Sequence, residues 1–173
     1  QGNDSVAIGT NAGQTDQGNQ SIAIGYEAGQ HNQDKNCVAI GYQAGYNDQG
    51  EDKDWFSVAI GYLAGKDVQD QGAIAIGHQA GVLEQKEFGI AIGVNAGSNN
   101  QGINSVALGT YSARLNQGSN AIAVGTKINK AKQSIGIKLN RYSRVRPENP
   151  GSFSSSKYGN GIATLSLKTK GSP

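Results

Sequence analysis

One sixteen-residue pattern, repeated eight times in phase, constrains this chain more than any other feature. Each repeat opens small-Φ-Ala-Φ-Gly, where Φ is an aliphatic residue, and successive starts lie 16 residues apart with one exception. The exception is the 20-residue interval from Cys37 to Ser57, after which the later repeats keep their phase. Contacts between neighbouring repeats must therefore fix the register, which is typical of a solenoid. The repeats start at Ser5, Ser21, Cys37, Ser57, Ala73, Gly89, Ser105 and Ala121.

The composition also favours a repeat protein over a globule. Only 36% of the 173 residues are hydrophobic and 26 are glycines, which is too polar for an ordinary globular core. Disordered segments share such a composition, but disorder does not need a strict period. No apolar run approaches the roughly 18 residues of a membrane-spanning helix. Neither a signal peptide nor an initiator Met is visible, so we expect a processed chain or a fragment of a longer protein with no direct membrane span.

The aliphatic residues of each repeat predict a short β-strand. They are mostly β-branched and recur with a period of two, which is the periodicity of a strand. The pairs are Val6/Ile8, Ile22/Ile24, Val38/Ile40, Val58/Ile60, Ile74/Ile76, Ile90/Ile92, Val106/Leu108 and Ile122/Val124. The residue between them is always alanine: Ala7, Ala23, Ala39, Ala59, Ala75, Ala91, Ala107 and Ala123.

The invariant alanine predicts an oligomer. A strand face open to water would vary among polar residues, so something must crowd the alanine face and leave room for one methyl group. We expect the aliphatic pair to fill the inside of the coil. That burial is small beside the entropic cost of ordering sixteen residues. We therefore predict that the eight alanines pack against other copies of the chain, as the core of an oligomer with a narrow axis.

A glutamine is the one fixed residue in the polar, variable outer half of the repeat. It follows each start by twelve residues: Gln17, Gln33, Gln49, Gln69, Gln85, Gln101, Gln117 and Gln133. Stacked glutamines can hydrogen-bond amide to amide along the axis of a stack of strands. We therefore predict a structural ladder on the outer side of the coil.

These patterns predict an all-β, parallel β-solenoid of about eight 16-residue coils in residues 1–133. Residues 134–173 are predicted to form a basic C-terminal cap or extension: they carry seven Lys/Arg against one Asp/Glu, whereas residues 1–133 carry eight against twelve. Within the tail, SIGIKL is a candidate ninth half-coil, RPENPGS a turn and GIATLSLK a last strand. Aromatic residues are sparse there, so we expect capping, or docking to a carrier capsid or cell-surface stalk, and not nucleic-acid binding.

The units NSVALG, SIAIGYEAG and SVAIGYLAG resemble the head repeats of trimeric autotransporter adhesins, the YadA-like head, whose motif reads N-S-V-A-I-G-x-x-A/S. The resemblance extends over about residues 5–133. It implies a left-handed parallel β-roll, an obligate homotrimer and a role in surface attachment. Similar repeats also resemble those of virus and phage fibres. The present coil is longer than the family's usual one, and neither a neck motif nor a heptad stalk is recognisable after residue 133.

No pattern of enzymatic chemistry is present in the sequence. His31 and His78 have no partner at motif spacing, and no nucleophile elbow, P-loop or calcium-binding repeat occurs. The single Cys37 can form no intrachain disulfide, and no Cys/His spacing matches a zinc site. We expect no enzyme activity, no metal and no cofactor.

Two features are candidate receptor-binding sites. The position after the first glycine of each repeat holds Tyr26, Tyr42, Tyr62 and His78 in four consecutive coils, which predicts an aromatic ridge. The ridge either covers a seam between subunits or offers flat faces and polar tips to a glycan or protein. The insertion EDKDWF carries Trp55 and Phe56, and these either form a binding loop or fold back as a plug.

The sequence thus predicts a non-enzymatic trimeric adhesin or fibre segment that attaches to a host cell or matrix. Its expected location is extracellular, on a cell or virion surface. The alternative is a purely structural spacer or filament-forming segment. The partners expected are further copies of the chain and a host-surface glycan or protein.

Overall fold

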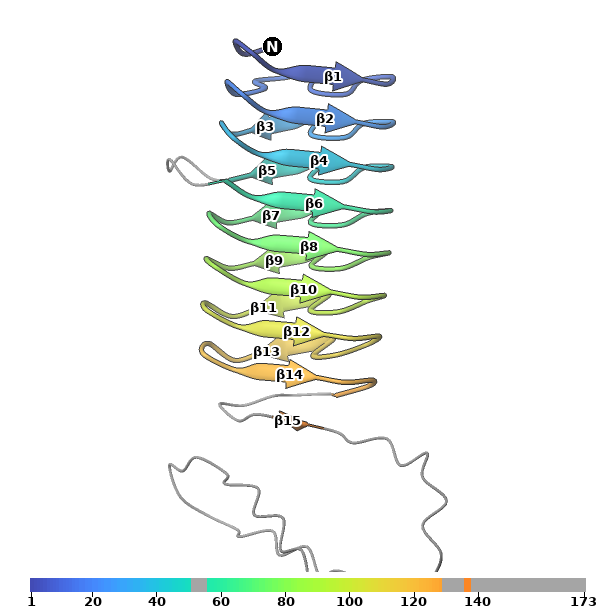
Figure 1. The fold of residues 1–173 in the computed structure, drawn as a ribbon, viewed down its shortest axis with the longest axis vertical. Coiled ribbons are helices and arrows are strands. Elements are labelled where there is room, and N and C mark those ends of the chain that lie inside the picture. Colours follow the sequence, from blue (N-terminus) through green and yellow to red (C-terminus); the bar gives the residue numbers. More distant parts are fainter. Residues whose placement is uncertain (51–55, 129–135, 138–173) are drawn as a thin grey trace, which may run out of the picture. The chain divides into compact units, whose positions relative to one another are not determined.

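The computed structural model describes residues 1–50, 56–128 and 136–137, and these form a parallel β-solenoid of about seven turns without a helix (Figure 1). Each complete turn contributes one three-residue strand to each of two sheets. The nine-stranded first sheet consists of β1 (Val6–Ile8), β2 (Ile22–Ile24), β4 (Val38–Ile40), β6 (Val58–Ile60), β8 (Ile74–Ile76), β10 (Ile90–Ile92), β12 (Val106–Leu108), β14 (Ile122–Val124) and β15 (Gly136–Ile137). The six-stranded second sheet consists of β3 (His31–Gln33), β5 (Asn47–Gln49), β7 (Asp67–Gln69), β9 (Leu83–Gln85), β11 (Asn99–Gln101) and β13 (Leu115–Gln117).

All strand pairs are parallel, and equivalent residues of neighbouring coils pair with one another. Ala59 pairs with Ala75 in the next coil. The insertion does not disturb this register, since Ala39 pairs with Ala59 across it. As the repeat phase predicts, the coils stack in register on both sides of the insertion.

The central alanines of the first-sheet strands lie inside the coil, and the prediction that they face other copies is wrong. Seven of them, Ala23, Ala39, Ala59, Ala75, Ala91, Ala107 and Ala123, are 0% exposed within a single chain. Only Ala7, in the first coil, is exposed. The interior beside these alanines is too narrow for a larger side chain: a Cβ on Gly65, in the corner between the two sheets, would lie 3.3 Å from the Cβ of Ala59. The Val and Ile side chains therefore point outward, opposite to the expectation.

The glutamines form an amide ladder, but it lies in the interior and not on the outer side of the coil. The Nε2 atoms of Gln17, Gln33, Gln49 and Gln69 each donate to Oε1 of the glutamine in the next coil, at 3.1–3.2 Å. Each Nε2 also donates across the coil to a first-sheet carbonyl oxygen; for Gln69 this acceptor is Val58 O, at 2.9 Å. The glutamine thus fills the interior and ties the two sheets together. Gln133 lies outside the described residues.

Two glycines in each of the first six coils permit this close packing. A Cβ on Gly77, at φ +129°, would lie 2.7 Å from the carbonyl oxygen of Gly93. A Cβ on Gly81, at φ +53°, would lie 2.6 Å from Oε1 of the ladder residue Gln85. In the seventh coil Ala113 takes the position of Gly81, at φ +44°. The ladder lapses around this coil, where Oε1 of both Gln101 and Gln117 is buried and accepts no hydrogen bond.

The first sheet continues past residue 133. Strand β15 pairs in parallel with β14, with Val124 opposite Ile137. The segment SIGIKL thus contributes a ninth strand, one of the uses that the sequence suggested. Residues 138–173 lie outside the described part of the chain, and the division of the chain at residue 133 stays a prediction.

Candidate interaction surface

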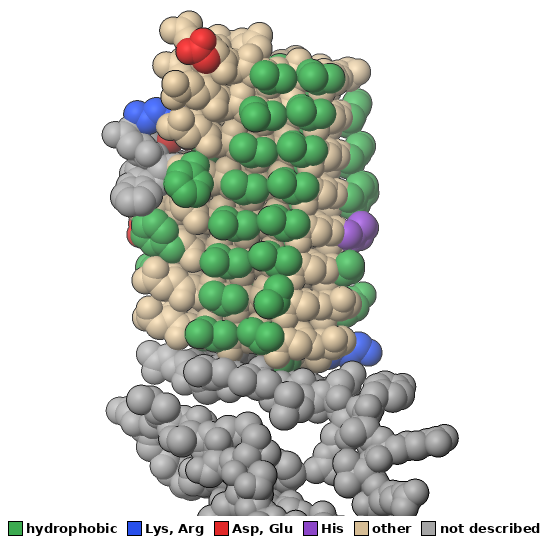
Figure 2. All heavy atoms as spheres, viewed as in Figure 1, with side chains coloured by type: hydrophobic (Ala, Val, Ile, Leu, Met, Phe, Trp, Pro, Cys, Tyr) green, Lys and Arg blue, Asp and Glu red, His purple; other side chains and the backbone are tan. Residues whose placement is uncertain are grey.

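The outward face of the first sheet is a continuous aliphatic surface, which we call the aliphatic face. It consists of the eight Val/Ile/Leu pairs of β1, β2, β4, β6, β8, β10, β12 and β14, stacked as two columns (Figure 2). Most of these side chains are half-buried by their neighbours in the column. Several remain well exposed, including Ile8 at 58% and Leu108 at 41%. Single exposed aliphatic residues are common on protein surfaces, but a contiguous apolar patch marks an interaction site.

The outward face of the second sheet is polar by comparison. Its outer positions carry mainly amide, carboxylate and imidazole groups, which bond to one another along the stack. Asn47 Nδ2 donates to Asp67 Oδ1 at 2.7 Å, and Asn32 Nδ2 donates to Asp48 Oδ1 at the same distance. Leu83 and Leu115 are its exposed aliphatic exceptions. The two sheets enclose the same interior and differ in their outer faces. The outer face of the first sheet is suited to protein contact, and that of the second is suited to water.

The predicted aromatic ridge is present beside the aliphatic face. Ring centroids are 5.3 Å apart for Tyr26–Tyr42, 5.2 Å for Tyr42–Tyr62 and 4.9 Å for Tyr62–His78, with interplanar angles of 10–15°. The three tyrosines are 43–46% exposed. Because the rings stack face to face, both faces of Tyr42 and Tyr62 are covered by their neighbours. The ridge therefore presents ring edges and hydroxyl groups, and not the flat faces that the sequence suggested.

Hydrogen bonds hold the polar groups at the first turns of the ridge. Gln43 Nε2 donates to Glu27 Oε2 at 2.6 Å, and this bond is the main cause that lowers the pKa of Glu27. The hydrogen bond and charge of Glu27 in turn raise the pKa of Tyr26. The carboxylate is thus ionised and the phenol neutral at pH 7, so this end of the ridge carries a negative charge beside a hydroxyl group.

Comparison with known protein families gives one match. The model of the YadA head domain repeat matches two copies, at residues 1–12 and 86–112. The second match runs through β10 and β12, where the outward aliphatic pairs and inward alanines of the solenoid alternate. The chain carries YadA-like head repeats. No curated protein and no solved structure gives a significant match.

A corner precedes each first-sheet strand of the YadA-like repeats. Two of these corners each bear one exposed aromatic residue. Phe56 is 53% exposed and Phe88 is 38% exposed. The ring of Phe88 lies over Gly72, where a Cβ would be 2.6 Å from its Cδ1. Phe88 has φ +55°, in the left-handed region that bulky residues rarely adopt. Trp55, predicted beside Phe56, lies outside the described residues.

The described part of the YadA-like repeats offers no constellation for metal chemistry. No group of three or more His, Cys, Asp or Glu residues could hold a metal ion there. Cys37 is buried in the small-residue position that starts its coil, with Sγ 3.6 Å from Gln49 O, and burial raises the pKa of its thiol to about 11. Its thiol is therefore inert at neutral pH. Among the described residues no helix is long and apolar enough to cross a membrane.

Three features of this surface escaped the sequence reasoning. The aliphatic face was assigned to the interior, although the invariance of alanine could have shown that only a methyl group fits inside so thin a coil. Phe88 was overlooked because it replaces the usual Asn, Asp or Gln before a strand and falls outside the repeat motif. Gln1 lies one period before Gln17, and its Nε2 donates to Ser5 O at 3.3 Å, the same four-residue contact that Gln69 makes with Ala73 O.

Proposed function

We propose that this chain is a segment of a homotrimeric, non-enzymatic adhesin or fibre, and that its aliphatic face lies between the three copies. The observation that supports the proposal is the unbroken outward column pair over eight coils. Covering such a surface with a partner is favourable by about 25 cal/mol for each Å² of apolar area removed from water. A partner with the same period covers all eight coils at once, and a second copy has that period by construction.

The trimer and the left-handed path belong to the proposal, and the YadA head match supports both. Three copies around an axis parallel to the stack would direct six aliphatic columns inward. The polar second sheets would then face water on the outside of the rod. The expected location is the surface of a cell or virion, with residues 134–173, which carry a net charge of +6, docking to the next segment or to a carrier.

We assign attachment to the inserted segment and to the hydroxyl tips of the ridge. Candidate contacts with a host glycan or protein are Trp55, Phe56, Tyr26, Tyr42, Tyr62 and His78. The insertion is acidic around its aromatic residues, at Glu51, Asp52 and Asp54, which suits a sugar or a basic protein patch better than a phosphate. Three symmetry-related copies of a weak site would act together through avidity.

Deletion of residues 51–54 together with Trp55→Ala tests this assignment. The deletion restores the sixteen-residue period, so we expect the variant to keep its circular-dichroism spectrum and its trimeric mass. Binding to host-cell or matrix surfaces should fall by at least tenfold. Unchanged binding by the folded trimer would remove the loop from the attachment site, and loss of folding would show that Trp55 is a plug.

A structural spacer is the second candidate function. The in-register stack and its internal glutamine ladder favour it, because they set a length without requiring a ligand. A glycan array and host-cell binding assay on the parent trimer separate the two functions. Absence of any binding by a correctly assembled trimer would favour the spacer.

A further inference from the structure

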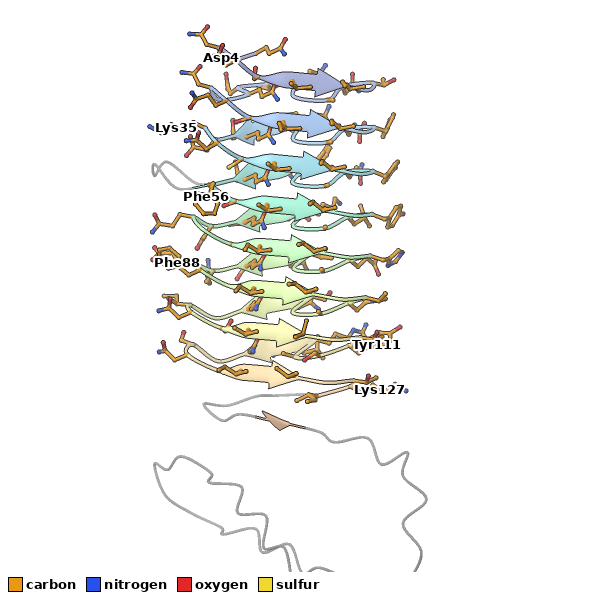
Figure 3. All side chains as sticks on the ribbon, in the orientation of Figure 1. Asp4, Lys35, Phe56, Phe88, Tyr111 and Lys127 are labelled. Atoms are coloured by element: carbon orange, nitrogen blue, oxygen red, sulfur yellow. The ribbon has the colours of Figure 1, made fainter. Side chains whose placement is uncertain are left out.

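Each coil has two edges beside the aliphatic face, and in every coil whose first edge carries a large apolar residue the second edge carries one too. We call the two residues before each repeat start the leading edge, and the two residues after the glycine that follows each strand the trailing edge. In the sixth coil these are Glu87 and Phe88, and Val94 and Asn95. In Figure 3, the leading-edge residues Phe56 and Phe88 lie at one side of the stack, and the trailing-edge residues Tyr111 and Lys127 lie at the other.

Large apolar residues occur on the described leading edges of only three coils. They are Phe56 in the fourth coil, Phe88 in the sixth and Ile103 in the seventh, exposed by 53%, 38% and 41%. All other described leading-edge residues are Asn, Asp, Gln, Glu, Gly, Lys or Ser. These three coils therefore depart from the repeat at a corner where part of each apolar side chain stays exposed within a single chain.

The same three coils carry the extra apolar residues of the trailing edge. They are Leu63 in the fourth coil, Val94 in the sixth and Tyr111 in the seventh. Val94 is 40% exposed. Outside the ridge, the other trailing-edge residues are polar: Thr10, Asn11, Glu27, Gln43, Gln79, Asn95, Thr110, Thr126 and Lys127. Tyr26 and Tyr42 lie in coils with polar leading edges, where their hydroxyl groups can hydrogen-bond.

A single chain gives no reason for this agreement, because a strand of the first sheet separates the two edges of one coil. A cyclic assembly explains the agreement. Rotation about an axis parallel to the stack keeps every coil at its height, and cyclic interfaces of more than two copies are heterologous. The trailing edge of each coil then meets the leading edge of the same coil in the next copy.

We propose that the two edges form a seam between adjacent copies, in which Val94 packs against Phe88 and Tyr111 against Ile103 of the neighbouring copy. The inference rests on the proposed homotrimer and adds the pairing and the vertical register of its subunits. Phe56, Phe88 and Ile103 all meet Leu63, Val94 and Tyr111 only when the copies are level, so the seam favours the level arrangement over a shift by one coil, which keeps one of these three matches.

Engineered disulfides between copies test the seam in a Cys37→Ser background, since serine occupies the equivalent position in four other coils. Phe88→Cys combined with Val94→Cys places one thiol on each edge of the sixth coil. We expect mild oxidation to convert most of the protein to a covalent trimer on non-reducing denaturing gels. Each single variant should remain a monomer on the same gels, because equal edges do not meet.

A mismatched pair is the control. Phe88→Cys with Thr126→Cys sets the thiols two coils apart, roughly 10 Å along the axis, which exceeds the roughly 7 Å Cα separation that a disulfide spans. This pair should not cross-link. A trimeric mass by light scattering without cross-linking of the matched pair would overturn the seam and leave the trimer standing. A monomeric parent chain would instead overturn the proposed function.

A second matched pair decides the outcome if the first disturbs assembly. Ile103→Cys with Tyr111→Cys places the thiols on the edges of the seventh coil. Covalent trimers from this pair would support the seam. Absence of cross-links, loss of assembly by this pair as well, or equal cross-linking by the mismatched pair would overturn it.

Discussion

The two sheets of the solenoid enclose the same interior but present opposite surfaces. The first sheet carries paired aliphatic side chains outward in every coil, whereas the second carries mainly Asn, Asp, Glu and His. Both sheets fill the inside with small or amide side chains: alanine from the first and glutamine from the second. In this protein, apolar side chains thus mark an outer contact surface, and the interior is held by close packing and hydrogen bonds.

The largest effect should follow from enlarging the inward alanines. Ala59→Leu with Ala75→Leu should abolish folding, because each leucine would overlap the opposite wall of the coil; overpacking of a tight core costs about 1–3 kcal/mol or more per site. Circular dichroism should show loss of β-structure. Ile60→Leu with Ile76→Leu, the matched outward pair, should fold normally. A folded but monomeric alanine variant would show that these residues face other copies after all.

That reversal shows what could be read from the sequence. The period, the strands and the glutamine ladder follow from residue spacing, because backbone pairing forces equivalent residues into stacked rows. The direction of the rows does not follow from period two alone, since alternation distinguishes the two faces of a strand without saying which is inside. The narrow interior decides it, since a Cβ added to Gly65 would lie only 3.3 Å from the Cβ of Ala59. Phe88 and Val94 lie on the two edges of the sixth coil, and both are apolar. This shared character could be recognised only once the structure had shown which residues form the edges of a coil.

The next effect concerns assembly alone. Ile60→Asp with Ile76→Asp should give folded monomers, because a buried, unpaired carboxylate is strongly unfavourable in an interface. Leu83→Asp with Leu115→Asp places the same charges on the outward face of the second sheet and should leave the trimer intact. Light scattering and circular dichroism together measure both outcomes. Equal loss of assembly in the two variants would remove the distinction between the faces.

A smaller effect, on stability, should distinguish a glutamine in the middle of the ladder from one at its end. Gln69 accepts from Gln49 and donates to Val58 O, Ala73 O and Gln85 Oε1. Gln69→Leu should lower the free energy of unfolding by roughly 2–5 kcal/mol, since each unpaired buried group costs about 1–3 kcal/mol.

Gln117→Leu is the control for the ladder. Its Oε1 already accepts no hydrogen bond, and within the described residues its Nε2 donates to Val106 O and Ala121 O. The loss of stability should be clearly smaller than for Gln69→Leu. Denaturant midpoints measure the difference, and equal shifts would contradict a cooperative ladder.

The smallest predicted effect is a gain in stability. Ala113 has φ +44° where the earlier coils carry glycine, so Ala113→Gly should stabilise the chain by about 1 kcal/mol. Ala80→Gly, at a buried position outside the left-handed region, should destabilise it by a similar amount. Thermal unfolding of the two variants should therefore shift in opposite directions. A lower melting temperature for Ala113→Gly would show that its methyl group packs usefully.

The mass of the parent chain in solution tests the central claim most directly. If the aliphatic face lies between copies, multi-angle light scattering should give three times the 17.9 kDa chain mass, unchanged on tenfold dilution. A chain that shows β-structure by circular dichroism and a mass of 17.9 kDa would contradict the account, because its aliphatic face would then be stable in water.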